Sequence, residues 1–105
     1  MDFSQLVERA LSIRKQYEEK ERSLYGSPWT SEELALGFVG DVGDLAKLVV
    51  AENGKRPIPD SRRKLEHELA DCLWSVIVLA NVHGIDMEQA FLQTMNELEE
   101  HLAKK

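Results

Sequence analysis

Four acidic side chains stand in two pairs with the same spacing. Asp41 and Asp44 are three residues apart, and so are Glu68 and Asp71. In an α-helix, residues three apart lie on one side of the helix, about 4.5 Å from each other along its axis. Each pair would therefore present two carboxylates in one direction, an arrangement suited to holding a metal ion.

Carboxylates gathered in this way point to one kind of metal chemistry. Four facing acids would repel one another and lose hydration, a cost that requires a compensating partner. A divalent cation would supply it, and oxygen ligands are those that Mg²⁺ or Mn²⁺ prefers. Because Mg²⁺ usually takes further ligands from substrate phosphates, the two pairs predict a Mg²⁺ site, with Mn²⁺ as an alternative ion, that acts on phosphates.

The elements that must position these acids are helices. Apolar residues recur at three- and four-residue steps along four segments, and no strand pattern competes with them. We place the helices at about 2–22, from a capping box at Thr30 and Glu33 to Asn53, from a cap at Asp60 or Ser61 to about His83-Gly84, and from Asp86 onward. Connections of about three to eight residues predict antiparallel neighbours in an all-α, four-helix bundle-like domain that covers residues 1–105.

The acids occupy places where these helices should be apolar. Asp41 falls on the inward stripe of the second helix, between Phe38 and Leu45. Glu68 falls on or beside the stripe of the third helix, and Asp71 borders it. Acid pairs are common on solvated helix surfaces, but two pairs that intrude on apolar stripes of neighbouring helices favour a site over a plain surface.

Composition narrows the class of partner. A chain of 105 residues is the size of one domain, and its net charge of −6 argues against binding to a nucleic-acid polymer, which needs a basic face. The single cysteine, Cys72, cannot form an intrachain disulfide and suits a reducing cytoplasm. No stretch approaches the roughly 20 apolar residues that span a bilayer. We therefore expect a cytoplasmic protein with no membrane partner.

Three segments carry a resemblance to a known family. In order, they read Gly40-Asp41-Val42-Gly43-Asp44, Glu68-Leu69-Ala70-Asp71 and Gly84-Ile85-Asp86. The chain thereby resembles the MazG-like all-α nucleoside triphosphate pyrophosphohydrolases over roughly residues 29–102, since their hallmark is a Glu-Glu-x-x-Glu helix followed by a Glu-x-x-Asp helix. It departs from that pattern in the first helix, where Gly40 replaces one glutamate and the shorter aspartates replace the other two.

The resemblance implies an activity and a set of residues for it. Members of the family hydrolyse the bond between the α and β phosphates of a nucleoside triphosphate, giving a nucleoside monophosphate and pyrophosphate. The implied metal ligands are Asp41, Asp44, Glu68 and Asp71. Of these, Asp41, Glu68 and Asp71 are the implied catalytic residues, with Asp41 a candidate to position the attacking water as general base. Family members usually pair, so we expect a homodimer or a homotetramer.

Other side chains have two interpretations each. Trp29 is placed to stack on a nucleobase near the start of the second helix, or to anchor the connection by packing. The cations Lys47, Arg62 and Arg63 would neutralise a triphosphate, or belong to solvated surface. Both alternatives stay open for each residue.

Two other functions compete with the hydrolase. One is a catalytically silent helical module that binds a nucleotide or a protein partner, which Gly40 and the shortened acids favour. The other is a purely structural oligomeric bundle. Product formation separates the hydrolase from the silent module, whereas only the structural bundle predicts that Mg²⁺ with nucleotide leaves the melting temperature unchanged.

Overall fold

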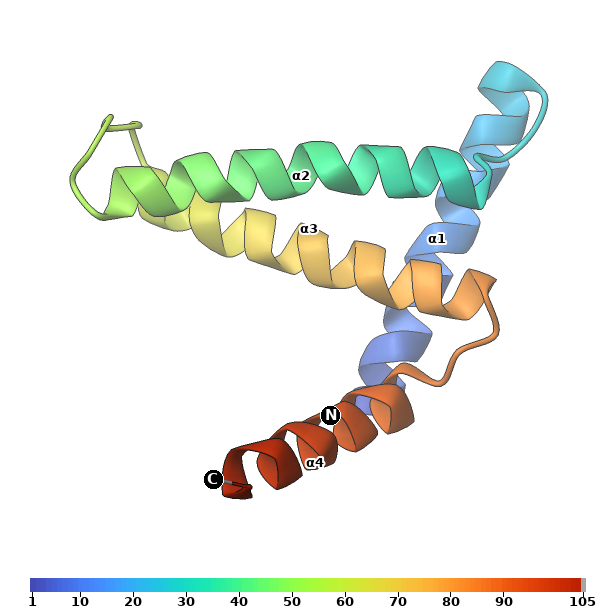
Figure 1. The fold of residues 1–105 in the computed structure, drawn as a ribbon. Coiled ribbons are helices and arrows are strands. Elements are labelled where there is room, and N and C mark those ends of the chain that lie inside the picture. The colour runs from blue at the N-terminus through green and yellow to red at the C-terminus, as the bar shows by residue number, and fades with distance from the viewer. Residues whose placement is uncertain (105) are drawn as a thin grey trace.

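The chain folds into four helices joined by short connections. The computed structural model describes residues 1–104, in which α1 spans Phe3–Tyr25, α2 Ser31–Glu52, α3 Ser61–Val82 and α4 Met87–Ala103 (Figure 1). Those residues contain no strand, so the predicted all-α class is confirmed. The first helix runs three residues beyond its expected end, to Tyr25. It is capped by Gly26, whose φ of 86° is the left-handed conformation that glycine adopts without strain.

Helix starts follow the sequence signals with one exception. The capping box at α2 is present: the Thr30 hydroxyl accepts the Glu33 N–H at 3.2 Å, and the Glu33 carboxylate accepts the Thr30 N–H at 2.9 Å. The Asp86 carboxylate likewise accepts the Gln89 N–H at the start of α4. Asp60 or Ser61 was expected to cap α3. The helix starts at Ser61, and Asp60 before it has a left-handed backbone, with φ 57°, and makes no capping hydrogen bond through its side chain.

The centre of the fold is an antiparallel hairpin of α2 and α3, which lie side by side over most of their length (Figure 1). Both helices contribute apolar residues to the core. The stripe predicted for α2 is confirmed at Leu48, whereas the stripe predicted for α3 passes through Leu69, which is 52% exposed. The buried apolar residues of the two helices are Leu48, Ala51, Ile77, Val78 and Ala80. This hairpin sets the middle of α2 against the first half of α3, which is where the two acid pairs are.

One end of the hairpin rests on α1, which crosses behind it (Figure 1). The joint is centred on Trp74 of α3, whose Nε1–H donates to the carbonyl oxygen of Ala10 at 3.0 Å. The Trp74 ring also packs against Tyr17, with ring centroids 5.8 Å apart and planes tilted by 56°. An aromatic contact and a hydrogen bond thus hold α1 against α3.

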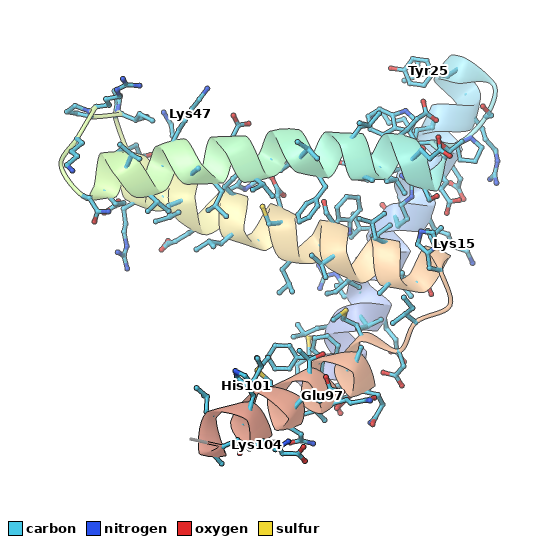
Figure 2. The ribbon with its side chains drawn as sticks, in the orientation of Figure 1. Lys15, Tyr25, Lys47, Glu97, His101 and Lys104 are labelled. Carbon is cyan, nitrogen blue, oxygen red and sulfur yellow. The ribbon has the colours of Figure 1, made fainter. Side chains whose placement is uncertain are left out.

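The last helix leaves the other three. The chain turns by 105° between α3 and α4, and α4 has no buried residue. Figure 2 shows the part of α4 that carries Glu97 and His101 standing clear of the other helices, whereas Met87 at its start lines a cavity with residues of α1 and α3. Short connections therefore predicted the neighbours along the chain but not the packing of α4. Within residues 1–104 no single helix is long and apolar enough to cross a membrane, although α3 and α4 as a bent pair meet that test.

Candidate functional site

Three of the four predicted acids meet between α2 and α3. One carboxylate oxygen from each of Asp41, Asp44 and Glu68 lies within 4.8 Å of the other two. The first two come from adjacent turns of α2, and Glu68 faces them from α3. We call these three residues the acid cluster; its members are close enough to share one cation.

Glu68 is the member whose charge is least compensated by its surroundings. Its Oε1 is buried and has no hydrogen-bond partner among residues 1–104. Burial raises the pKa of Glu68, and the negative charges of Asp41, Asp71 and Asp44 raise it further. A cation would relieve both causes, and a set of carboxylate oxygens is the donor set that Mg²⁺ accepts. The residues present therefore fit a divalent metal ion.

The fourth acid is close by but differently engaged. Asp71 lies outside the acid cluster, and its Oδ2 is 3.2 Å from Nε2 of His67, one turn back on α3. His67 was not among the site residues predicted from the sequence, and its position beside Asp71 was missed. The signal was available, because residues four apart on a helix are neighbours and His67 is four residues before Asp71.

A cavity lined by three cationic side chains opens on one side of the acid cluster. It has a volume of about 570 Å³, and we call it the basic cavity after Lys47, Arg63 and Lys64, although an equal number of acids also lines it. Its lining consists of Asp44, Lys47, Leu48, Ile58, Asp60, Arg63, Lys64, His67 and Glu68. Two of the predicted phosphate-binding residues, Lys47 and Arg63, lie here. The third, Arg62, does not line it, whereas Lys64 does.

A second cavity, of about 690 Å³, lies where α1 meets the hairpin. We call it the aromatic cavity, because Tyr17, Tyr25, Trp29 and Trp74 are part of its wall. The remaining lining residues are Ile13, Arg14, Lys20, Glu21, Leu24, Leu34, Asp41, His67, Ala70 and Asp71. Trp29, predicted to stack on a base, is therefore in a wall with other aromatic rings. The four acids lie between the two cavities, because two of them border each one.

A buried ion pair closes part of the aromatic cavity and was not foreseen. Arg14 and Glu21 of α1 are 7% and 8% exposed, and their two hydrogen bonds are 2.9 and 3.0 Å long. Burial would raise the pKa of Glu21, but the Arg14 guanidinium and the Trp29 N–H hold it below its usual value. Glu21 follows Tyr17 by four residues, so it breaks the apolar stripe of α1 as Asp41 breaks that of α2.

Comparison with known proteins bears on the same residues. The model of the MazG nucleotide pyrophosphohydrolase domain matches residues 29–102, a region that holds both acid pairs and runs from the start of α2 almost to the end of α4. Neither the curated proteins nor the solved structures contain a significant match to the chain. Since the family model covers well over half of the sequence, the chain belongs to the MazG nucleotide pyrophosphohydrolase family.

Proposed function

We propose that the protein is a Mg²⁺-dependent nucleoside triphosphate pyrophosphohydrolase that releases a nucleoside monophosphate and pyrophosphate. The observation that carries the proposal is the acid cluster with the buried, unpartnered oxygen of Glu68. Family membership supports the same reaction class. In the cytoplasm, where we place the reaction, Mg²⁺ and nucleoside triphosphates are both at hand.

The four acids would bind the metal ion. Asp41, Asp44 and Glu68 would hold the ion, and Asp71 would complete the set after giving up its contact with His67. A bound divalent ion supplies charge for phosphate oxygens and lowers the pKa of water. Mn²⁺ has similar ligand preferences and would substitute for Mg²⁺.

The chain's own residues would then bind and orient the substrate. Lys47 and Arg63 line the basic cavity beside Glu68, where they would neutralise the phosphates that leave as pyrophosphate. Trp29 would stack on the base in the aromatic cavity. Asp41 borders that cavity. In place of binding the metal ion, it would then position the water that attacks phosphorus and accept its proton as the bridging oxygen leaves on the other phosphate.

The reaction can be tested directly on the purified protein. We would incubate it with Mg²⁺ and a panel of ribo-, deoxy- and modified nucleoside triphosphates and separate the products by chromatography. Monophosphate plus pyrophosphate is the expected result, with loss of turnover in Asp44→Asn and full turnover in Glu66→Gln. Glu66 is a matched control, because it is an exposed acid on α3 outside both cavities.

The silent binding module is the second candidate, and Gly40 is the residue that favours it. A Cβ at this position would meet nothing within 4 Å, so there is room for the acid that the family pattern has and this chain lacks. No turnover across the panel with either Mg²⁺ or Mn²⁺, together with a nucleotide-dependent rise in melting temperature, would replace the hydrolase with this module.

We propose in addition that the protein works as a homodimer or a dimer of dimers. The chain exposes 8247 Å², against about 6000 Å² for a compact monomer of 12.0 kDa. Its radius of gyration of 16.8 Å also exceeds the roughly 13 Å expected for this length. The surplus area is of the order that stable subunit interfaces cover. Exposed apolar side chains on three helices, among them Leu36, Val39, Leu73, Phe91 and Leu98, supply such a surface.

A further inference from the structure

The buried pair of α1 makes its further contacts with the main chain of one residue, Trp29. Glu21 Oε1 accepts the Trp29 N–H at 2.8 Å, and Arg14 Nη2 donates to the Trp29 carbonyl oxygen at 3.4 Å. Both main-chain polar groups of Trp29 are thus held by side chains from α1. Trp29 lies between Pro28 and the capping residue of α2, in the connection that joins the two helices.

Stability alone does not explain why α1 carries a buried ion pair. Burying two charges costs desolvation that their attraction repays only with good geometry, and an apolar pair of similar volume often serves as well. A bidentate pair differs from an apolar pair in that the planar guanidinium and the carboxylate fix each other's orientation. Here Glu21 Oε1, which the pair orients, is also the atom that holds the Trp29 N–H.

The fixed main chain anchors Trp29 at its Cα, and a contact with α2 places its ring. Its Cζ3 atom is 3.9 Å from the place that a Cβ on Gly37 would occupy, so the ring lies over the second turn of α2. Trp29 as a whole residue is 44% exposed, and it lines the aromatic cavity together with Arg14 and Glu21. Movement of the 29–30 main chain would therefore shift a wall of that cavity.

We infer that Arg14 and Glu21 are positioning residues that hold Trp29 as a wall of the aromatic cavity and thereby set which planar ring the cavity accepts. The inference rests on the proposed function for the nature of the ring, a nucleobase. It assigns the pair no contact with the phosphates and none with the metal. Loosening the pair should then weaken binding of the base and flatten the preference among bases, while the chemical step stays intact.

The decisive variant is Arg14→Met/Glu21→Met, which keeps the volume and removes both holds on Trp29. We expect KM for the preferred triphosphate to rise about tenfold, the scale of one base–aromatic stacking contact, with kcat within about twofold of the starting protein. The preference among bases should narrow, and the affinity for Mn²⁺ should not change. The matched control is Lys15→Met/Glu19→Met, an exposed pair on the same helix that lines neither cavity (Figure 2 labels Lys15).

Two further variants separate positioning from bulk stability. Glu21→Gln keeps an oxygen that can accept the Trp29 N–H, so it should restore KM most of the way. Arg14→Lys keeps the charge but cannot make the two-atom contact, so it should raise KM in the same direction; it also serves if the double variant does not fold. Equal losses of kcat in every variant, or a double variant with unchanged KM and base preference, would overturn the inference.

A measurement without substrate distinguishes this inference from the proposed function. The chain has two tryptophans, so Trp74→Phe leaves Trp29 as the only one. In that background, the Arg14→Met/Glu21→Met change should make Trp29 easier to quench with acrylamide, and the control pair should not. If quenching of Trp29 does not change, the inference is wrong. Failure of the proposed function would be seen separately, as absence of turnover in the unaltered chain.

Discussion

At the scale of single residues, Glu68 ties the stability of the chain to pH. Its folded-state pKa is raised above 4.5, so the folded chain holds this proton more tightly than the unfolded chain does. The resulting stability is present below pH 4.5 and is lost as the pH rises through the folded-state pKa. Glu21 and Asp2 act in the opposite direction, because their pKa values are lowered and their stabilising effect is lost in acid.

Glu68→Gln isolates this effect. Without metal, we expect the variant to melt above the starting protein at pH 8, by roughly 4 °C. The reason is that one charge within 4.8 Å of another costs about 1 kcal/mol when water screens it. The difference should shrink toward pH 4.5, and Mg²⁺ should stabilise only the starting protein. Thermal melts over this pH range provide the measurement. A difference that stays constant with pH would show that the repulsion at Glu68 is not its source.

Asp71 provides a second prediction at this scale. Asp71→Asn should abolish turnover and leave the helical circular dichroism unchanged. The affinity for Mg²⁺ should fall by at least the roughly 10- to 100-fold that is typical even of groups that only orient metal ligands. Steady-state kinetics would measure turnover, and a Mg²⁺ titration of the protein would measure the affinity. Full activity at low Mg²⁺ would leave Asp71 as a partner of His67 alone.

At the scale of elements, α4 is the helix with the least support. A helix of 17 residues that buries no side chain has little tertiary packing to hold it. We expect its amides to exchange with deuterium faster than those of α2 and α3 in dilute solution, and to become protected as the protein concentration rises. Hydrogen-exchange mass spectrometry at two concentrations checks this. Strong protection of α4 in dilute solution would mean that the helix is stable without a neighbour.

The same scale shows which features sequence patterns can predict. Caps such as Thr30 and stripes such as that of α2 are local, so they were predictable from spacing. Asp41, Asp44 and Glu68 could be selected from the sequence because an acid on an apolar stripe is conspicuous. Glu21 is also an acid on an apolar stripe and could have been selected in the same way. By contrast, the four-residue spacing of His67 and Asp71 allows their contact, but whether it forms depends on the side-chain rotamers. The departure of α4 depends on what covers it, which the spacing within one helix does not encode.

At the scale of the whole molecule, the exposed apolar area argues for assembly. We expect light scattering after gel filtration to give two or four times the chain mass of 12.0 kDa. Phe91→Glu/Leu98→Glu should shift the protein toward monomer and lower its melting temperature, because both side chains are about half exposed on α4. Asn96→Glu adds a charge at an exposed polar site on α4 and should have no such effect. If Phe91→Glu/Leu98→Glu does not dissociate either, the interface lies elsewhere, on α2 or α3.

The two cavities on either side of the acids have a kinetic consequence. If the bond between the α and β phosphates is cut at the acid cluster, pyrophosphate is left in the basic cavity and the monophosphate in the aromatic one. Both cavities open to solvent, so neither product blocks the exit of the other. Release would then be random in order. The monophosphate and pyrophosphate would each inhibit the enzyme when added alone. Added together, the two products would form a complex in which the enzyme holds both.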